Sequence, residues 1–188
     1  MTWHGRWLNA PPRAEEEDGA LVVTAAEGSD LWRDTAYGFR HENGHALLRP
    51  LEAGSAIEVA FLCDYDGTFD QAGALLWIDE ANWLKTGVEI SDGLAQLGAV
   101  ATRGKSDWSM APVPDWVGRE VTVRLSRAGD AVTVRARVDE EPWRMVRLAP
   151  VDPEAVVEAG PFFCAPERAD LTVRFTAWRS GPADASLH

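Results

Sequence analysis

The sequence is short of cysteine and of long apolar runs, and both shortages exclude classes of protein. Only two of its 188 residues are cysteines, Cys63 and Cys164, and no Cys-x-x-Cys pair or Cys/His cluster occurs. A thiolate metal site is therefore not expected, and whether the two thiols pair stays open. No run approaches about 18 consecutive apolar residues, and the N-terminal MTWHGRWLNAPP lacks the apolar core of a signal peptide. We therefore expect no transmembrane helix, no secretion and a cytoplasmic protein.

Basic charge is also scarce. The chain has 18 Lys and Arg against 30 Asp and Glu, which gives a net charge of −12. Nucleic-acid binding and adhesion to anionic membranes both need a basic surface. The composition therefore excludes nucleic acid and membrane as expected partners, and it says nothing about the oligomeric state.

The common catalytic motifs are absent as well. The sequence contains no nucleophile elbow, P-loop, G-x-G-x-x-G or H-E-x-x-H motif. Hydrolases of the nucleophile-elbow type, NTPases, dinucleotide-dependent dehydrogenases and zincin proteases consequently receive no support. We expect no cofactor.

What the chain does contain is a series of short apolar segments separated by turns. Turn pairs such as Asn43-Gly44 and Asp92-Gly93 recur, roughly every ten residues, and no long amphipathic helix is apparent. The clearest hairpin joins residues 119–127 to 130–139, where apolar and polar residues alternate. This pattern predicts an all-β protein, an antiparallel two-sheet jelly-roll sandwich that forms one domain over residues 1–188, with a loose tail from about residue 181.

The stretch 71–109 is the most informative part of the chain. Three strands, at 71–79, 83–91 and 94–103, follow one another as hairpins and should be neighbours in one sheet. In the second strand Trp83, Lys85, Gly87 and Glu89 share one face. Along a strand Lys85 and Glu89 are roughly 13 Å apart, so they cannot pair with each other. Because unpaired charges are costly to bury, each needs a cross-strand partner or a ligand.

This face predicts the floor of a binding groove. Nine tryptophans are present, and an indole ring offers a large apolar face with one hydrogen-bond donor, which suits sugar binding as well as core packing. The candidate ligand-binding residues are Gln71, Trp83, Lys85, Glu89, Asp107 and Trp108.

Three further segments carry expectations of their own. Residues 13–19 are expected to form an exposed polar connection, and Ser29 or Asp30 to cap a short helical turn. His41 and His45 flank the Asn43-Gly44 turn and are expected to be exposed, because a third metal ligand is missing. The acidic loop 64–70 lacks the spacing of an EF-hand, and calcium binding there stays open. No metal site is predicted.

Several segments are shared, in order, with a known family. They are 29–35 (SDLWRDT) with 37–39 (YGF), 71–73 (QAG), 82–89 (NWLKTGVE), 106–109 (SDWS), and 160–162 (GPF) with 165–168 (APER). Together they resemble the domain-of-unknown-function 1349 family, a group with regulation-of-enolase-like members in the concanavalin A-like lectin/glucanase superfamily. The resemblance spans nearly the whole chain and implies a concanavalin A-like fold. It implies no particular activity, because a shared fold does not supply a reaction.

Three functions are compatible with these observations. The first is a lectin-like protein that binds a carbohydrate or a small polar ligand in the groove. The second is a glycan-acting hydrolase or lyase. The E-x-D-x-E strand of the superfamily's glucanases is missing here, since Gly87 and Ser91 flank Glu89 at alternate positions. A second acid for hydrolysis would have to come from Asp79 or Asp107. In a lyase, Lys85 would be the base. The third is a regulatory protein-interaction module of carbohydrate metabolism. No catalytic residue is assigned.

Overall fold

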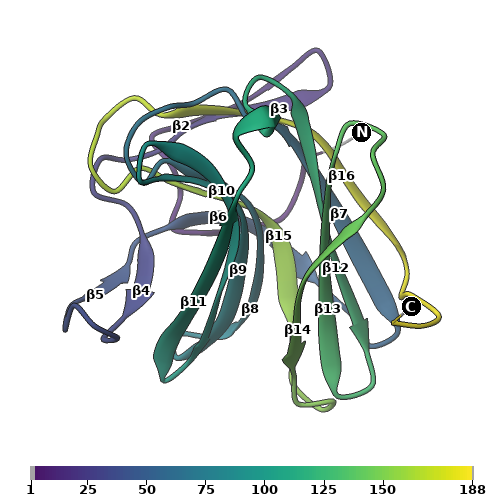
Figure 1. Ribbon diagram of the computed structural model, residues 1–188. Helices are drawn as coiled ribbons and strands as arrows, with labels where there is room; N and C mark the ends of the chain where they lie inside the picture. Colours follow the sequence, from purple (N-terminus) through teal and green to yellow (C-terminus); the bar gives the residue numbers. More distant parts are fainter. Residues whose placement is uncertain (1–2, 188) are drawn as a thin grey trace.

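The computed structural model describes residues 3–187 as two antiparallel sheets packed face to face, with a small two-stranded sheet outside them (Figure 1). The predicted two-sheet sandwich is confirmed, and the described part of the chain contains sixteen strands. The first sheet has the order β1 (Arg6–Leu8), β6 (His45–Pro50), β15 (Glu158–Cys164), β8 (Gln71–Asp79), β9 (Asn82–Ser91), β10 (Leu94–Arg103), β11 (Lys105–Pro112). The second has the order β14 (Arg144–Pro150), β13 (Ala131–Val138), β12 (Glu120–Ala128), β7 (Ser55–Leu62), β16 (Thr172–Pro182), β3 (Ala20–Thr24), β2 (Arg13–Glu17). The remaining elements are β4 (Leu31–Arg33), β5 (Arg40–Glu42) and a single 3₁₀ turn, η1 (Pro114–Trp116).

The main core lies between the two sheets and follows from strand alternation. In β12, Val121, Val123 and Leu125 are fully buried and face the first sheet, while the residues between them face away. In β9, Leu84, Val88 and Ile90 fill the same layer from the other side. The opposite face of β9 is therefore turned outward, as the alternation predicted.

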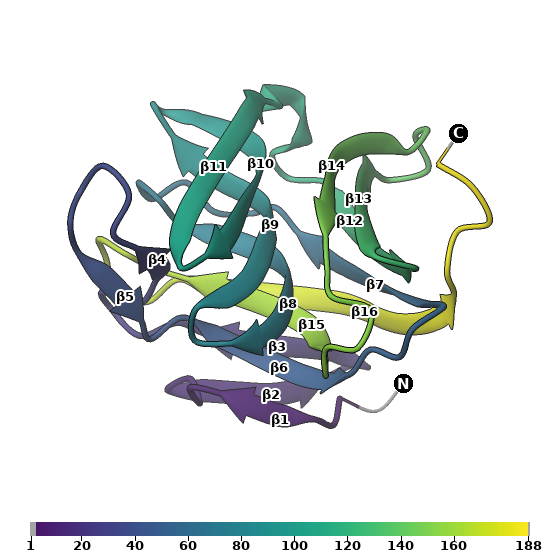
Figure 2. The ribbon, with the colours of Figure 1, turned by 90° about the horizontal axis from the view of Figure 1, so that it is seen from below.

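That outward face of the first sheet is covered by the β4–β5 hairpin. Figures 1 and 2 both show β4 and β5 standing beside the curved sheet of β8 to β11, away from the second sheet. A second apolar cluster lies beneath the hairpin and consists of Leu31, Trp32, Ala46, Leu48, Leu75, Trp83, Val100, Phe162 and Cys164. Strand β8 is thus covered on both faces, which explains why it is apolar almost throughout.

Two segments differ from the sequence-based expectations. Residues expected to be a polar connection form β2, an edge strand that pairs with β3 only. Its charged side chains suit an edge, because they discourage pairing with another chain. The helical turn expected at Ser29 and Asp30 is replaced by β4, which pairs with β5 over Leu31 to Arg33.

The C-terminal segment, expected to be loose, is held against the second sheet. Strand β16 runs to Pro182, and Asp184 continues past it. The Asp184 amide donates to Ser126 Oγ at 2.8 Å, and its carboxylate accepts from Arg124 at 2.9 Å and also from Arg135. The arginine face of β12 and β13 is therefore partly covered by this segment. His188 lies outside the described residues.

Both cysteines are free and buried. Burial raises the pKa of the Cys63 thiol to about 11, so it is a neutral, unreactive group at neutral pH. In the described part of the chain, no helix is long and apolar enough to cross a membrane.

Candidate ligand-binding pocket

The three central hairpin strands place their outward side chains in rows across the sheet. One row joins Gln71 on β8 to Glu89 on β9 and Gln96 on β10. A parallel row places Lys85 between Leu75 and Val100. Polar groups that are distant in sequence thus become neighbours, because directly paired residues of adjacent strands point to the same face.

A row of glycines separates these two rows. Gly73, Gly87 and Gly98 are paired across β8, β9 and β10. A Cβ atom on Gly87 would lie 2.0 Å from the carbonyl oxygen of Ala72, so no side chain fits there without moving the backbone. The floor between Lys85 and Glu89 consequently consists of bare backbone.

Lys85 is buried and held by two oxygen atoms. Its Nζ donates to Asp30 Oδ1 at 2.7 Å and to Gln71 Oε1 at 2.8 Å. Burial opposes the charge of this ammonium, but the surrounding acidic groups, Asp30 first among them, together outweigh that effect and raise the Lys85 pKa. Lys85 is therefore protonated at neutral pH, and one of its three N–H groups has no acceptor within residues 3–187.

Asp30 and Gln71 are themselves fixed by the backbone around them. The Leu31 amide donates to Asp30 Oδ1 at 2.7 Å, which leaves Oδ2 without a donor among the described residues. Gln71 Nε2 donates to the carbonyl of Phe69 at 3.1 Å. Phe69 has a φ of 61°, a left-handed conformation that is uncommon for a bulky residue and is a form of strain found at functional sites.

Glu89 differs from Lys85 because its side chain has no hydrogen-bond or ion-pair partner among residues 3–187. It is half-buried, and in the described chain its carboxyl group makes no hydrogen bond or ion pair. Burial raises its pKa to about 7, and Lys85 opposes this only in part. A carboxyl group of this kind is available to a ligand.

The aromatic wall of the pocket comes from the β4–β5 hairpin and from β11. The Trp32 ring lies 6.1 Å from Trp108 at 86° and 5.6 Å from Tyr37 at 61°. Tyr37 stacks on Phe39 at 5.2 Å, and Phe39 meets the His41 ring at 4.7 Å. Tyr37 and Phe39 keep 59% and 44% of their surface exposed, which is unusual for large rings and marks the rim of the pocket.

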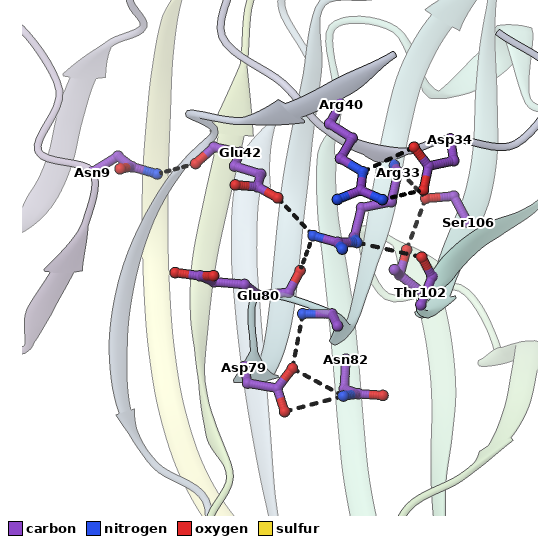
Figure 3. A network of polar contacts seen from close by, with 12 residues as sticks. Asn9, Arg33, Asp34, Arg40, Glu42, Asp79, Glu80, Asn82, Thr102 and Ser106 are labelled. Carbon is purple, nitrogen blue, oxygen red and sulfur yellow. Dashed lines mark hydrogen bonds and ion pairs between the residues drawn. The ribbon is translucent and has the colours of Figure 1, made fainter. Parts of the chain in front are cut away.

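Polar contacts anchor the hairpin to the first sheet (Figure 3). The Arg33 amide donates to Ser106 Oγ on β11 at 2.9 Å, and this hydroxyl also bonds Thr102 on β10 at 2.8 Å. The Arg33 guanidinium contacts Glu42 at 2.6 Å and the carbonyl of Glu80 at 3.1 Å. These bonds fix the aromatic wall relative to the polar floor.

Floor and wall enclose a cavity of about 320 Å³. Its lining comprises Asp30, Trp32, Tyr37, Phe39, His41, Phe69, Gln71, Lys85, Glu89, Val100, Trp108, Pro166 and Glu167. Aromatic rings dominate one side and convergent polar groups the other, which is the usual composition of a small-molecule site.

Four of the six sequence-predicted site residues line this cavity, namely Gln71, Lys85, Glu89 and Trp108. Trp83 shares the face of Lys85 but is only 4% exposed, since it is buried in the second apolar cluster. Asp107 lies on the opposite face of β11 and pairs with Arg147 on β14 at 3.0 Å. Neither Trp83 nor Asp107 reaches the pocket.

Sequence reasoning missed the wall and one half of the Lys85 ion pair. Asp30, Trp32, Tyr37, Phe39 and Glu167 come from segments outside the central hairpins. The available signal was the family resemblance, because all five lie in its shared segments 29–35, 37–39 and 165–168. Strand periodicity carried no such signal, because it predicts which face of a strand a residue lies on and not which distant loop contacts that face.

One expectation about the histidines is wrong. His45 is buried, its Nε2 accepts from the Ala26 amide at 3.0 Å, and its Nδ1 lies 2.9 Å from the Asn9 carbonyl. This requires the proton on Nδ1 of a neutral ring, and burial lowers the His45 pKa accordingly. His41, by contrast, is half-buried at the pocket.

The acidic loop 64–70 makes protein contacts through its last residue. Asp70 is fully buried, and its Oδ2 accepts from Arg168 Nε at 2.8 Å and from the Gly67 amide at 3.1 Å. This pair joins the loop before β8 to the segment after β15 and so supports the rear of the pocket.

Comparisons of sequence place the chain among known proteins. A family model described as "Protein of unknown function (DUF1349)" matches residues 7–183. "Regulation of enolase protein 1" of Saccharomyces cerevisiae is 39% identical over 187 residues, which cover 98% of this chain and 93% of the relative. An uncharacterized protein of Emericella nidulans is 28% identical over 129 residues, covering 65% of this chain and 64% of that protein.

Comparisons of structure agree. A functionally unknown protein from Saccharomyces cerevisiae has a TM-score of 0.90 at 36% identity, covering 97% of this chain and 98% of that one. A xylan β-1,4-xylosidase from Bacillus halodurans has a TM-score of 0.68 at 15% identity, covering 88% of this chain but 33% of the enzyme. An alginate lyase from Klebsiella pneumoniae has a TM-score of 0.61 at 9% identity, covering 89% and 83%. The last two share the fold alone.

Proposed function

The chain belongs to the DUF1349 family, and we propose that it binds a small hydroxylated ligand, of which carbohydrates are the leading class, in the pocket between β9 and the β4–β5 hairpin. The observation that carries the proposal is Glu89, a half-buried carboxyl group with no partner in the described chain, on the same sheet face as Lys85, which is oriented by two hydrogen bonds and keeps one donor free. A ligand would supply the hydrogen bonds that the protein leaves unmade.

The free polar atoms of the floor indicate which groups the ligand presents. Among the described residues, the Glu89 oxygens and Asp30 Oδ2 are left to accept hydrogen bonds from a ligand, and Lys85 retains one donor. Hydroxyl groups suit this arrangement because each one both donates and accepts. The bare backbone of Gly87 leaves room for the ligand between the two charged residues.

The aromatic wall supports the same class of ligand. The rings of Tyr37, Trp32 and Trp108 line the same pocket as the polar groups of the floor, and the C–H face of a sugar ring packs on aromatic rings. The xylosidase and the lyase that share the fold are named for action on glycans, but the likeness shows the fold alone. The proposal therefore rests on the pocket.

The test is a thermal-shift and calorimetric screen of mono- and oligosaccharides against the wild type, Trp108→Leu and Asp107→Asn. A binding sugar should raise the melting temperature of the wild type, since ligands that bind only the native state stabilise it. The gain should disappear in Trp108→Leu and persist in Asp107→Asn, whose altered side chain lies on the other face of β11. If no sugar binds, or if both variants behave alike, the proposal fails.

A catalytic role is the second candidate, and one observation favours it. A carboxyl group whose pKa is about 7 can give and take a proton at neutral pH, as Glu89 would. The lyase mechanism with Lys85 as base is not favoured, because Asp30 holds that ammonium protonated. Product formation from any sugar that binds, lost in Glu89→Gln while binding persists, would support turnover; binding without product would leave the lectin-like function.

A further inference from the structure

The charges that line the pocket do not balance. Among residues 3–187, Lys85 is the only lysine or arginine in the lining, and its charge is matched by Asp30 at 2.7 Å. Glu89 and Glu167 remain, and among residues 3–187 neither side chain forms a hydrogen bond or ion pair. The chain as a whole carries −12, so no distant excess of positive charge offsets them. This excess of negative charge would repel an anionic ligand such as a sugar acid or a phosphate ester.

The aromatic rings around the same space are arranged at steep angles to each other. Trp32 is nearly perpendicular to Trp108 and is tilted by 61° from Tyr37. Trp32 is thus packed edge to face against both Trp108 and Tyr37, and all three rings line the cavity. Faces of Trp and Tyr attract ammonium groups, and several rings with a nearby carboxylate form the aromatic cages that recognise quaternary ammonium ligands.

On the premise that the pocket binds a small ligand, we propose that this ligand carries a cationic ammonium group, held between the rings of Trp32, Tyr37 and Trp108 and the carboxylate of Glu89. An amino sugar with a free amine, or another hydroxylated amine, fits both this charge and the hydroxyl-binding floor. The cation would be the missing partner of Glu89, and its neutral analogue would lack that contact.

The titration of Glu89 should make the affinity for a cationic ligand depend on pH. The charged and titratable groups that share the cavity with Glu89 are Lys85 on β9, Asp30 before β4, His41 on β5 and Glu167 after β15. Burial raises the Glu89 pKa to about 7, so the carboxylate forms as the pH rises through neutrality. Affinity for a permanently charged cation should therefore increase from pH 5 to pH 8, whereas affinity for a neutral ligand should change little.

The experiment compares two pairs of probes that differ in charge. Choline and 3,3-dimethylbutan-1-ol have the same shape, with a quaternary nitrogen in one and a carbon in the other. Glucosamine and N-acetylglucosamine differ by a protonated amine. Calorimetry or thermal shift on the full chain should show at least one cationic member binding roughly tenfold or more tightly than its neutral partner at pH 7.5. The preference should weaken at pH 5 for choline, the probe whose charge is constant.

Two matched variants test whether Glu89 causes the preference for the cationic probe. Glu89→Gln keeps the shape of the side chain and should abolish the preference for the cation, while Asp107→Asn, a carboxylate on the other face of the same sheet, should leave it unchanged. Folding of Glu89→Gln is checked by its melting temperature at pH 5, where the wild-type carboxyl is mostly neutral.

The outcomes separate this proposal from the broader one. Binding of neutral sugars or of anionic ones with no gain for either cation would overturn the ammonium proposal and leave ligand binding in the pocket intact. A cation preference that survives Glu89→Gln would also overturn it. If none of the probes and no sugar of the screen binds at millimolar concentration, both proposals fall.

Discussion

The ammonium group of Lys85 lies 2.7 Å from Oδ1 of Asp30, a residue 55 positions earlier in the chain. The contact joins β9 of the first sheet to the entrance of the β4–β5 hairpin. It neutralises a buried cation and at the same time fixes the segment that carries the aromatic wall. This ion pair therefore links the polar floor of the pocket to the segment that leads into the apolar wall.

Breaking the Lys85–Asp30 ion pair should lower the free energy of unfolding more than replacing an exposed lysine does. Lys85→Met leaves the Asp30 carboxylate without its cation and should lower the free energy of unfolding by about 3 kcal/mol. The matched control is the chain's other lysine, because Lys105→Met alters an exposed side chain and should change stability by less than about 0.5 kcal/mol. Adding Asp30→Asn to Lys85→Met should restore part of the loss in urea unfolding, whereas additive losses would contradict the coupling.

Glu89 should make the protein less stable at high pH. Its folded pKa of about 7 lies above the ordinary value of a glutamate, so the folded state binds its proton more tightly than the unfolded state does. The resulting contribution to stability is complete below the unfolded pKa and is lost as the pH rises through about 7. Glu89→Gln should therefore gain stability relative to the wild type between pH 5 and pH 8, on the order of 2–3 kcal/mol. Glu167→Gln, an exposed carboxyl of the same pocket, should show no such trend in melting temperature.

His45 should act in the opposite direction. Burial lowers its pKa, and the ring accepts a hydrogen bond from the Ala26 amide that protonation would break. The contribution of the neutral ring is present above the unfolded pKa of about 6.5 and is lost as the pH falls toward the folded pKa. The melting temperature of His45→Gln should thus fall less steeply from pH 7 to pH 5 than that of the wild type. His4→Gln, at an exposed position, should follow the wild-type slope.

Substitutions of Trp83 and Trp108 should affect different properties, namely stability for Trp83 and ligand binding for Trp108. Trp83 is 4% exposed within the second apolar cluster, so Trp83→Ala should cost about 3–5 kcal/mol of unfolding free energy by leaving a cavity. Trp108 is half-buried at the pocket, and Trp108→Ala should cost less stability but abolish ligand binding. A Trp83→Phe variant that retains the fold should still bind. If Trp83→Phe has normal stability but does not bind the ligand, Trp83 is a binding residue and this prediction is wrong.

The alternation of side chains in 83–90 was enough to predict which face of β9 is turned outward. Strand period is a local property: successive side chains point to opposite sides whatever the rest of the chain does. The hairpin order of β8, β9 and β10 was predictable for a similar reason, because their connecting turns are short and leave antiparallel neighbours as the only arrangement. Gln71, Lys85 and Glu89 could therefore be placed on one surface from the sequence.

The same periodicity failed for Trp83 and Asp107 for two different reasons. Trp83 lies on the correct face, but the burial of that face varies along the strand with what covers it. Asp107 was grouped with Trp108 by proximity in sequence, although neighbouring residues of a strand point to opposite sides. His45 was misjudged as exposed because the segment around Asn9 that covers it lies far away in the chain.

By itself, the sequence determined the fold class, the central strands and the face that carries Gln71, Lys85 and Glu89, since these follow from local alternation and short turns. Only the tertiary structure decided that Asp30 pairs with Lys85 and that Trp32, Tyr37 and Phe39 join Trp108 in the wall. It also decided that Glu89 is left without a partner among residues 3–187. The physical reason is that such relationships are set by packing between segments far apart in the chain. No local pattern of residues records which loop folds over which face of a sheet.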